Sequence, residues 1–271
     1  MTLFTKLIVP LDGSQVASRA LPVAQILASQ LQVPTTLISF AISDESLDLA
    51  RERLDAAVEG FPQGAEVRLV RTKSVRTSLT THLTLTPERH GLVVMATHAL
   101  GPITEMLLGS VADDVVRQSP LPVVLVGPRV DPNALPGHYD ELVACVDGGP
   151  ADDRLVPLLT VARSELALRP KLIQVVTSTR RGPDGTPDVI LANPVERMAK
   201  LLDERDIAVD WEVLPGDDIA ATVTAYAAER HAILALATRG RDPLQRLREA
   251  STALSVVRHA TDPVIIFGPS T

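Results

Sequence analysis

The chain has 271 residues, of which 45% are hydrophobic but only 3% aromatic, and its formal net charge is -7. This length suits two domains of ordinary size with aliphatic cores, and the acidic balance argues against a protein that binds nucleic acids or anionic membranes. No apolar run approaches the roughly 20 residues of a membrane-spanning helix, the N-terminus lacks a signal-peptide pattern, and the single Cys145 excludes disulfide scaffolding, so we expect a cytoplasmic protein.

Strands and helices alternate along the first half of the sequence. The apolar patterns predict strands at 6–11, 35–42, 65–72, 91–97 and 122–127, and helices at 15–31, 45–60, 75–89 and 110–119. Pro22 lies inside the first helix and predicts a kink there. Apolar strands that alternate with helices are typical of a parallel sheet covered on both faces.

The second half of the sequence repeats the first. The residues ERHGLVVMATHA at 88–99 return as ERHAILALATRG at 229–240, an offset of 141, and KLIVPLDGS at 6–14 matches ELVACVDGG at 141–149, an offset of 135. A six-residue insertion near 177–190 accounts for the change of offset. Such a register indicates a tandem duplication.

The duplication defines the second set of elements and the domain limits. Strands of the second half are predicted at 141–146, 171–176, 208–214, 232–237 and 263–267. Pro157 occupies the place of Pro22 and predicts a second kink. We therefore expect an α/β protein of two tandem doubly wound domains, each with a five-stranded parallel sheet. The predicted domains are 1–128 and 141–271, joined by a linker at 129–140 within a segment rich in proline and glycine.

Candidate ligand residues cluster at the ends of predicted strands. In an open parallel sheet, ligands bind beyond the carboxyl ends of the strands, near the point where the strand order reverses. Each half carries an aspartate after its first strand, an Ala-Thr pair closing its fourth strand, and a serine opening the helix after a long loop. These residues are Asp12, Ala96, Thr97 and Ser110 in the first half, and Asp147, Ala237, Thr238 and Ser251 in the second.

These motifs resemble the universal stress protein family in its tandem form. The resemblance rests on VPLDGS, VVMATHA and LLGSVADDVVRQSPLPVVLV at 107–126, together with their second copies. It implies a Rossmann-like fold of the adenine nucleotide alpha hydrolase type and a role in the stress response. ATP-binding members of the family carry Gly-x-x-Gly, nine residues, and then Gly-Ser or Gly-Thr. Both halves here keep that spacing, with Ala96, Ala99, Gly109 and Ser110 in the first and Ala237, Gly240, Ala250 and Ser251 in the second.

The resemblance also implies which residues would hold the nucleotide. Asp12 and the end of the second strand near Phe40 would hold the adenine and ribose, and Gly109 with Ser110 would hold the phosphates of ATP accompanied by Mg²⁺. The remaining candidate contacts follow from their places beside these residues. They are Pro10, Ala96, Thr97, His98, Ala99 and Val111 in the first half, and Asp147, Ala237, Gly240 and Ser251 in the second.

The two copies differ in the parts of a phosphate site that they keep. Glycine permits close approach of backbone amides to phosphate, and a helix start attracts anions. The first copy keeps Gly109-Ser110, but its loop 98–108 has no lysine or arginine. The second copy has four arginines between 239 and 248, but Ala250 replaces the glycine. We therefore expect nucleotide binding mainly in the first half.

Simpler roles are open for the same residues. Asp12 and Asp147 could be turn-forming carboxylates, Ser110 and Ser251 could be helix N-caps, and the arginines could form a solvated loop face. Asp152 and Asp153 favour a helix N-terminus. No spacing of histidine, cysteine or acidic residues predicts a metal site.

Three functions follow from these observations. The first is a non-catalytic stress-response protein that binds ATP or another adenine nucleotide. The second is a tandem scaffold or interaction protein of the same family that has lost nucleotide binding, as the alanines suggest. The third is a weak ATP hydrolase, which the sequence supports least because no base or nucleophile, and hence no catalytic residue, is evident.

The last strand of each half suggests how the halves meet. The strands 122–126 and 263–267 are apolar and end their repeats, and an apolar edge strand invites pairing with an equivalent edge. The family resemblance implies the same pairing within one chain. We predict an intramolecular pseudo-dimer through these strands, while a further homodimer and a protein partner are left open.

Overall fold

The first half of the chain forms five strands that alternate with helices, as the sequence predicts. The computed structural model describes residues 3–12, 14–41, 44–85, 90–97, 110–177, 189–238 and 252–269. In chain order the first half contains β1 (Lys6–Pro10), α1 (Gln15–Ser18), α2 (Ala20–Leu31), β2 (Thr35–Ala41), α3 (Asp44–Val58), β3 (Ala65–Arg71), α4 (Val75–Leu85), β4 (Gly91–Ala96), α5 (Ser110–Gln118) and β5 (Val123–Val126).

The second half repeats this alternation with one change at its first helix. It contains β6 (Glu141–Cys145), the 3-10 helix η1 (Asp152–Leu155), α6 (Val156–Val161), β7 (Arg169–Val176), α7 (Val189–Asp203), β8 (Asp210–Pro215), α8 (Ile219–Ala228), β9 (Ile233–Ala237), a helix over 252–259 and β10 (Val264–Phe267). β8 begins two residues later than the predicted strand 208–214, and β7 begins two residues earlier than the predicted strand 171–176.

All ten strands join one sheet. Their order is β3-β2-β1-β4-β5-β10-β9-β6-β7-β8. Within each half every pairing is parallel, and the chain order reverses between β1 and β4 and again between β6 and β9. This is the doubly wound arrangement, and it places the two switch points where ligands bind in such folds.

The two halves join through their last strands. β10 pairs with β5 in the antiparallel direction, with Ile265 opposite Val124. The predicted pairing of 122–126 with 263–267 is thus observed. Because β5 and β10 pair with each other, the strands at the two ends of the sheet are β3 and β8. Two chains could therefore not pair with each other through β5 or β10.

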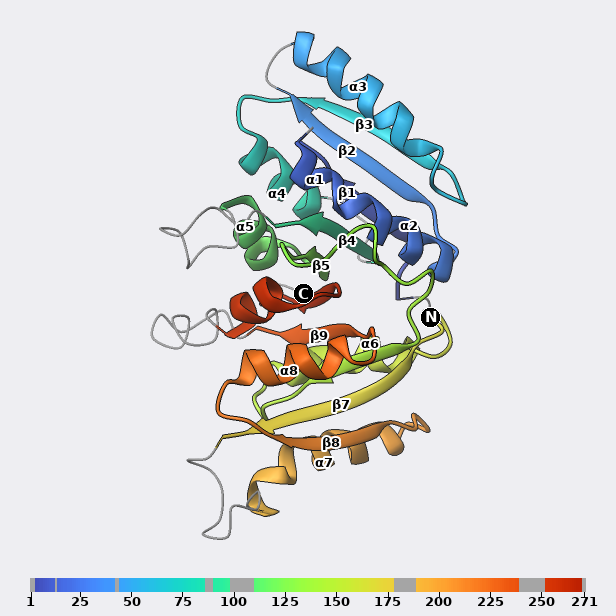
Figure 1. The fold of residues 1–271 in the computed structure, drawn as a ribbon. Coiled ribbons are helices and arrows are strands. Elements are labelled where there is room, and N and C mark those ends of the chain that lie inside the picture. The colour runs from blue at the N-terminus through green and yellow to red at the C-terminus, as the bar shows by residue number, and fades with distance from the viewer. Residues whose placement is uncertain are drawn as a thin grey trace.

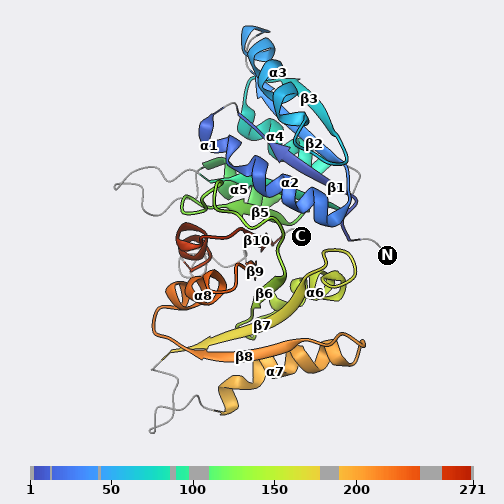
Figure 2. The same cartoon turned by 45° about the vertical axis from the view of Figure 1, so that its right-hand side comes forward.

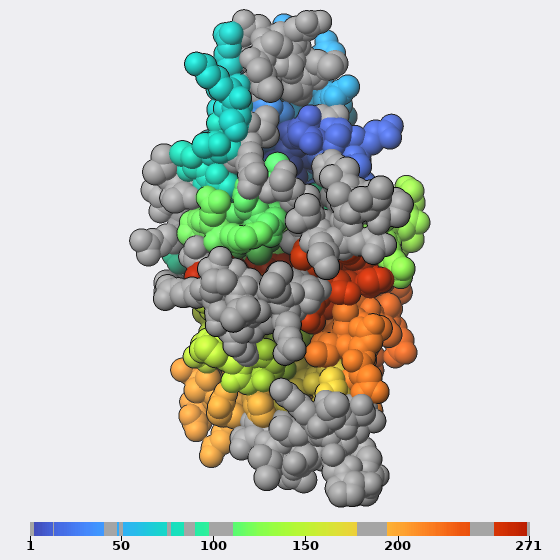
Figure 3. Space-filling model, turned by 90° about the vertical axis from the view of Figure 1, so that its left-hand side faces the viewer, coloured from blue at the N-terminus to red at the C-terminus, as the bar shows by residue number. Residues whose placement is uncertain are grey.

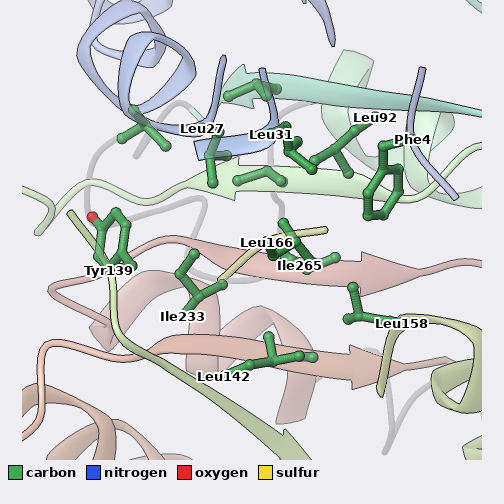
Figure 4. Packing of buried hydrophobic residues seen from close by; sticks show 14 of the residues in the cluster. Phe4, Leu27, Leu31, Leu92, Tyr139, Leu142, Leu158, Leu166, Ile233 and Ile265 are labelled. Carbon is green, nitrogen blue, oxygen red and sulfur yellow. The ribbon is translucent and has the colours of Figure 1, made fainter. Parts of the chain in front are cut away.

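The hydrophobic cores follow the faces of the sheet rather than the halves of the chain. One face is covered by α1, α2, α3, α6 and α7, and the other by α4, α5, α8 and the helix over 252–259 (Figures 1 and 2). On the first face, Leu27 and Leu92 of the first half share one buried cluster with Leu142 and Ile265 of the second (Figure 4). Each core therefore runs through both halves.

The sequence predicts a kink at each of two prolines, and the structure shows an interruption of the first helix just before each one. Pro22 has no N–H to donate to the carbonyl of Ser18, and α1 ends at Ser18 while α2 begins at Ala20. In the second half a 3-10 turn precedes α6, with Pro157 in the first turn of that helix. Proline is well placed there because first-turn amides have no helical partner.

The segment between the halves is folded onto the core. Val130 and Tyr139, within the predicted linker, are buried at 1% and 0% exposure. The side-chain amide of Gln30 on α2 donates to the carbonyls of Tyr139 (2.9 Å) and Leu166 (3.1 Å) and accepts from the Tyr139 N–H (3.1 Å). These three bonds tie the first half to the linker and the second half. The exact domain limits stay a prediction.

No helix within the described ranges is both long and apolar enough to cross a membrane.

On the face shown in Figure 3, residues close to the C-terminus lie between the end of the first half and the body of the second. A methyl group added at Gly127, after β5, would come within 2.0 Å of the carbonyl oxygen of Val257 in the helix over 252–259. The halves are in direct backbone contact at this point.

Candidate functional site

The strand registers bring the sequence-predicted residues of each half to one level at the edge of the sheet. Pro10 lies opposite Ile38, and Ile8 opposite Val93. Continuing these registers places Asp12 level with Phe40 and with Thr97. In the second half Cys145 lies opposite Ile173 and Ala144 opposite Ala235, so Asp147 is level with Val175 and Thr238. Each aspartate thus stands at the switch point.

Asp12 is exposed and its carboxylate shapes the turn after β1. Its Oδ1 accepts the backbone N–H of Ser14 at 2.9 Å. Ser14 is in turn the N-cap of α1, since its hydroxyl accepts the N–H of Ala17 at 3.1 Å. Both the turn and the cap expected from Asp-Gly-Ser are therefore present, although the cap is Ser14 rather than Asp12. Asp12 is thus an exposed carboxylate in a preformed turn at the switch point.

Asp147 makes the same turn in the second half, but its surroundings differ. Its Oδ1 accepts the N–H of Gly149 at 2.8 Å. The carboxylate of Asp152 folds back over this loop and accepts the N–H groups of Asp147 (3.2 Å) and Gly148 (2.8 Å). Asp152 is only 6% exposed. Asp152 lies in the first turn of η1, as expected from the sequence, and its carboxylate also holds the loop after β6 through these two hydrogen bonds.

The ends of the fourth strands are alike in the two halves. Ala96 and Ala237 are the last residues of β4 and β9, and Ala96 is 8% exposed. The next residue bonds across to the last strand: Thr97 N–H donates to the Val126 carbonyl at 3.0 Å and Thr238 N–H to the Phe267 carbonyl at 2.9 Å. These bonds fix the backbone at the residue that follows each strand.

Two arginines at equivalent positions of the repeat hold segments that follow strands, Arg19 after β5 and Arg154 after β9 and β10. Arg19 donates to the carbonyls of Pro128 (2.9 Å) and Val130. Arg154 donates to the carbonyls of Thr238 (2.6 Å) and Gly268 (3.1 Å). The offset of 135 between these arginines was visible in the sequence, but their function as clamps on the loop ends was not.

Pro10 and Phe40 lie near the site but are buried. Pro10 is the last residue of β1. Phe40 is 7% exposed, and its ring meets the ring of His82 on α4 edge-on, with centroids 6.4 Å apart. Burial lowers the pKa of His82, and the charges of Arg68 and Lys6 lower it further. Sequence reasoning missed His82, whose place on the inner face of α4 follows only from the packing.

Ser110 begins α5, and Val111 packs half-buried against the core beneath it. Asp113 in the first turn suits the positive end of the helix dipole and pairs with Arg117. Five other candidates fall outside the described residues. They are His98, Ala99, Gly109, Gly240 and Ser251. In the described part of the chain, no group of three or more histidine, cysteine or acidic side chains is arranged to hold a metal ion.

The comparisons with known proteins decide the family. The sequence model of the universal stress protein family matches twice, over residues 3–127 and 138–268. The chain belongs to the universal stress protein family. Two matches of this extent establish the tandem form, in agreement with the sequence prediction. No curated protein sequence matches the chain.

Solved structures support the same fold along the whole chain. A universal stress protein from Archaeoglobus fulgidus DSM 4304 is 16% identical, with a TM-score of 0.70 over 98% of this chain and 97% of that one. A functionally unknown protein from Pseudomonas aeruginosa PAO1 is 17% identical, with a TM-score of 0.67 over 98% and 93%. The cytoplasmic domain of a prokaryotic cation chloride cotransporter is 12% identical, with a TM-score of 0.53 over 97% and 95%. At these identities the likeness concerns the fold alone.

Proposed function

We propose that this universal stress protein binds ATP or another adenine nucleotide, with Mg²⁺, chiefly in its N-terminal half, and acts in the cytoplasm by binding rather than by catalysis. The observation that carries the proposal is the exposed carboxylate of Asp12, held at the switch point by the Ser14 N–H at 2.9 Å. One oxygen fixes the turn, and the other can accept a hydrogen bond from a ribose hydroxyl or an adenine amino group.

The start of α5 supplies the second part of the proposed site. The helix begins at Ser110 and is the next described element after β4. Amide groups of a first helical turn lack helical partners, and the helix dipole adds positive potential, so this end favours phosphate oxygens. Asp12 would therefore hold the nucleoside end and α5 the phosphate end.

The contrast between the halves supports an N-terminal location. The loop after β6 already has a buried carboxylate, Asp152, on the amides of Asp147 and Gly148. In the first half the corresponding position is Ala17, which carries no acceptor. The N-terminal loop can thus receive a ligand without displacing an anion of its own.

Isothermal titration with ATP and Mg²⁺ tests the proposal. Asp12→Asn keeps an oxygen for the Ser14 N–H but removes the negative charge, and should weaken binding by about tenfold or more. Asp131→Asn is the matched control, because Asp131 accepts the N–H of Asn133 at 2.9 Å in the same kind of turn but belongs to the predicted linker rather than to the proposed site. Asp147→Asn should have a much smaller effect than Asp12→Asn. Equal losses in the Asp12 and Asp131 variants would refute the assignment.

The second candidate function is a tandem scaffold that no longer binds nucleotide. Its support is the buried methyl of Ala96 at a position where ATP-binding members have glycine, together with the loop 98–108, which lacks lysine and arginine. Mass spectrometry of small molecules released from the purified, denatured protein separates the two functions. A retained adenine nucleotide favours the first, whereas no nucleotide and no heat at millimolar ATP favour the scaffold.

A further inference from the structure

The C-terminal half closes its own switch point from one side with Asp152. The carboxylate is 6% exposed and accepts two consecutive amides, Asp147 N–H at 3.2 Å and Gly148 N–H at 2.8 Å. The next amide, Gly149 N–H, is taken by Asp147 itself at 2.8 Å. Three successive donors at the carboxyl end of β6 are therefore used within the protein.

Pro194 of α7 closes the same loop from another side. Gly148 has a φ of +87°, and a methyl group added there would lie 2.7 Å from the Cγ atom of Pro194. The neighbouring Val195 is fully buried, and its N–H donates to the side-chain oxygen of Gln174 on β7 at 3.4 Å. Arg197 donates to the Gly148 carbonyl at 3.4 Å. The middle of α7 is thus fixed onto the loop.

The N-terminal half has neither closing residue. The offset of 135 places Ala17 at the position of Asp152, and Ala17 is similarly buried at 8% exposure. The offset of 141 pairs Val195 with Leu54, and both are buried in the same core cluster. The same offset places Arg53, which is exposed, at the position of Pro194.

We propose that Asp152 and Pro194 keep the C-terminal half from binding the adenine nucleotide, so that each chain binds one nucleotide, in the N-terminal half. This inference rests on the proposed function. The physical reason is that a nucleotide at the second switch point would meet a buried negative charge whose partners are backbone amides of the same loop. Displacing that carboxylate would break its hydrogen bonds to the amides of Asp147 and Gly148, which is costly for a buried charge.

Exchange of the closing residues between the halves tests this proposal. Asp152→Ala combined with Pro194→Ala should open the second loop, and titration with ATP and Mg²⁺ should then show a second binding event. Ala17→Asp should introduce a closing carboxylate into the first half and weaken binding by about tenfold or more, because an acidic side chain in the first turn of α1 can accept a preceding backbone amide. Asp153→Ala, an exposed neighbour with the same change of charge, is the control and should bind one nucleotide.

The outcomes separate this inference from the proposed function. One site in the wild-type protein and two in the double variant support both. One site in both proteins overturns the closure while nucleotide binding stands, and so does a wild-type protein with two sites. An absence of binding in every variant overturns the proposed function and this inference with it. The double variant buries no new charge, so it keeps the test valid if Ala17→Asp lowers the Tm.

Discussion

The side chain of Gln30 is the polar connection between the halves whose removal should cost the most stability. Gln30 lies on α2 in the first half, and its amide makes three hydrogen bonds of 2.9–3.1 Å to Tyr139 and Leu166. Tyr139 and Leu166 are both 0% exposed. Replacement by alanine leaves their backbone groups buried without this partner, where water cannot easily replace it.

The magnitude of the Gln30→Ala effect follows from these three bonds. A typical hydrogen bond contributes about 0.5–1.5 kcal/mol net, and an unsatisfied buried group raises the cost of its loss. Alanine regains a few tenths of a kcal/mol of helix propensity. We therefore expect the free energy of unfolding to fall by about 2–4 kcal/mol.

Urea unfolding followed by far-UV circular dichroism measures this change. Gln25→Ala is the control on the same helix, because the Gln25 side chain packs over Gly60 within the first half. It should cost much less than Gln30→Ala. If the two variants lose the same free energy to within about 0.5 kcal/mol, the limit expected for ordinary surface changes, Gln30 is not a connection between the halves and the reasoning fails.

Two further changes test the joint between the halves and a buried charge. Gly127→Ala should destabilise the chain by about 1–3 kcal/mol, because its methyl group would meet the Val257 carbonyl, whereas Gly137→Ala, with no atom within 4 Å of the new methyl, should be nearly neutral in thermal unfolding. Burial raises the pKa of Asp262, so keeping this side chain ionised near pH 7 lowers the free energy of unfolding. This loss of stability disappears as the pH falls to the ordinary pKa of an aspartate, where the side chain is protonated in the native state. Asp262→Asn should therefore unfold at higher urea concentration than wild type near pH 7, and the gap should narrow toward pH 4; a gap that widens on acidification would contradict this.

Most of the fold was predictable because the repeat supplied it twice. The apolar runs at Lys6–Pro10 and Glu141–Cys145 each form the first strand of their half, and the last strands pair with each other as predicted from their apolar sequences. The joining of all ten strands into one sheet with cores shared across the halves depends on contacts such as Gln30 with Tyr139, which lie 109 positions apart in the sequence. Sequence patterns of single elements do not encode such contacts.

The candidate site was predictable in its location but not in its asymmetry. Asp12 and Asp147 both follow a first strand, and both make the expected turn. The difference lies in Ala17 and Asp152, which are equivalent by the repeat, and the sequence predicts for Asp152 only a place at a helix N-terminus. The hydrogen bonds of Asp152 to the amides of Asp147 and Gly148 depend on how the loop after β6 folds, which the sequence pattern does not reveal.

The number of nucleotides bound per chain tests the central claim most directly. Native mass spectrometry of the purified protein with ATP and Mg²⁺ counts them without assuming a binding model, and Asp12→Asn provides the comparison. At an ATP concentration that just saturates the wild-type protein, we predict one ATP on the wild-type chain and a much lower occupancy on Asp12→Asn. Two ATP molecules on the wild-type chain, or equal occupancy of the wild-type and Asp12→Asn chains, would contradict the assignment of the site to the N-terminal half.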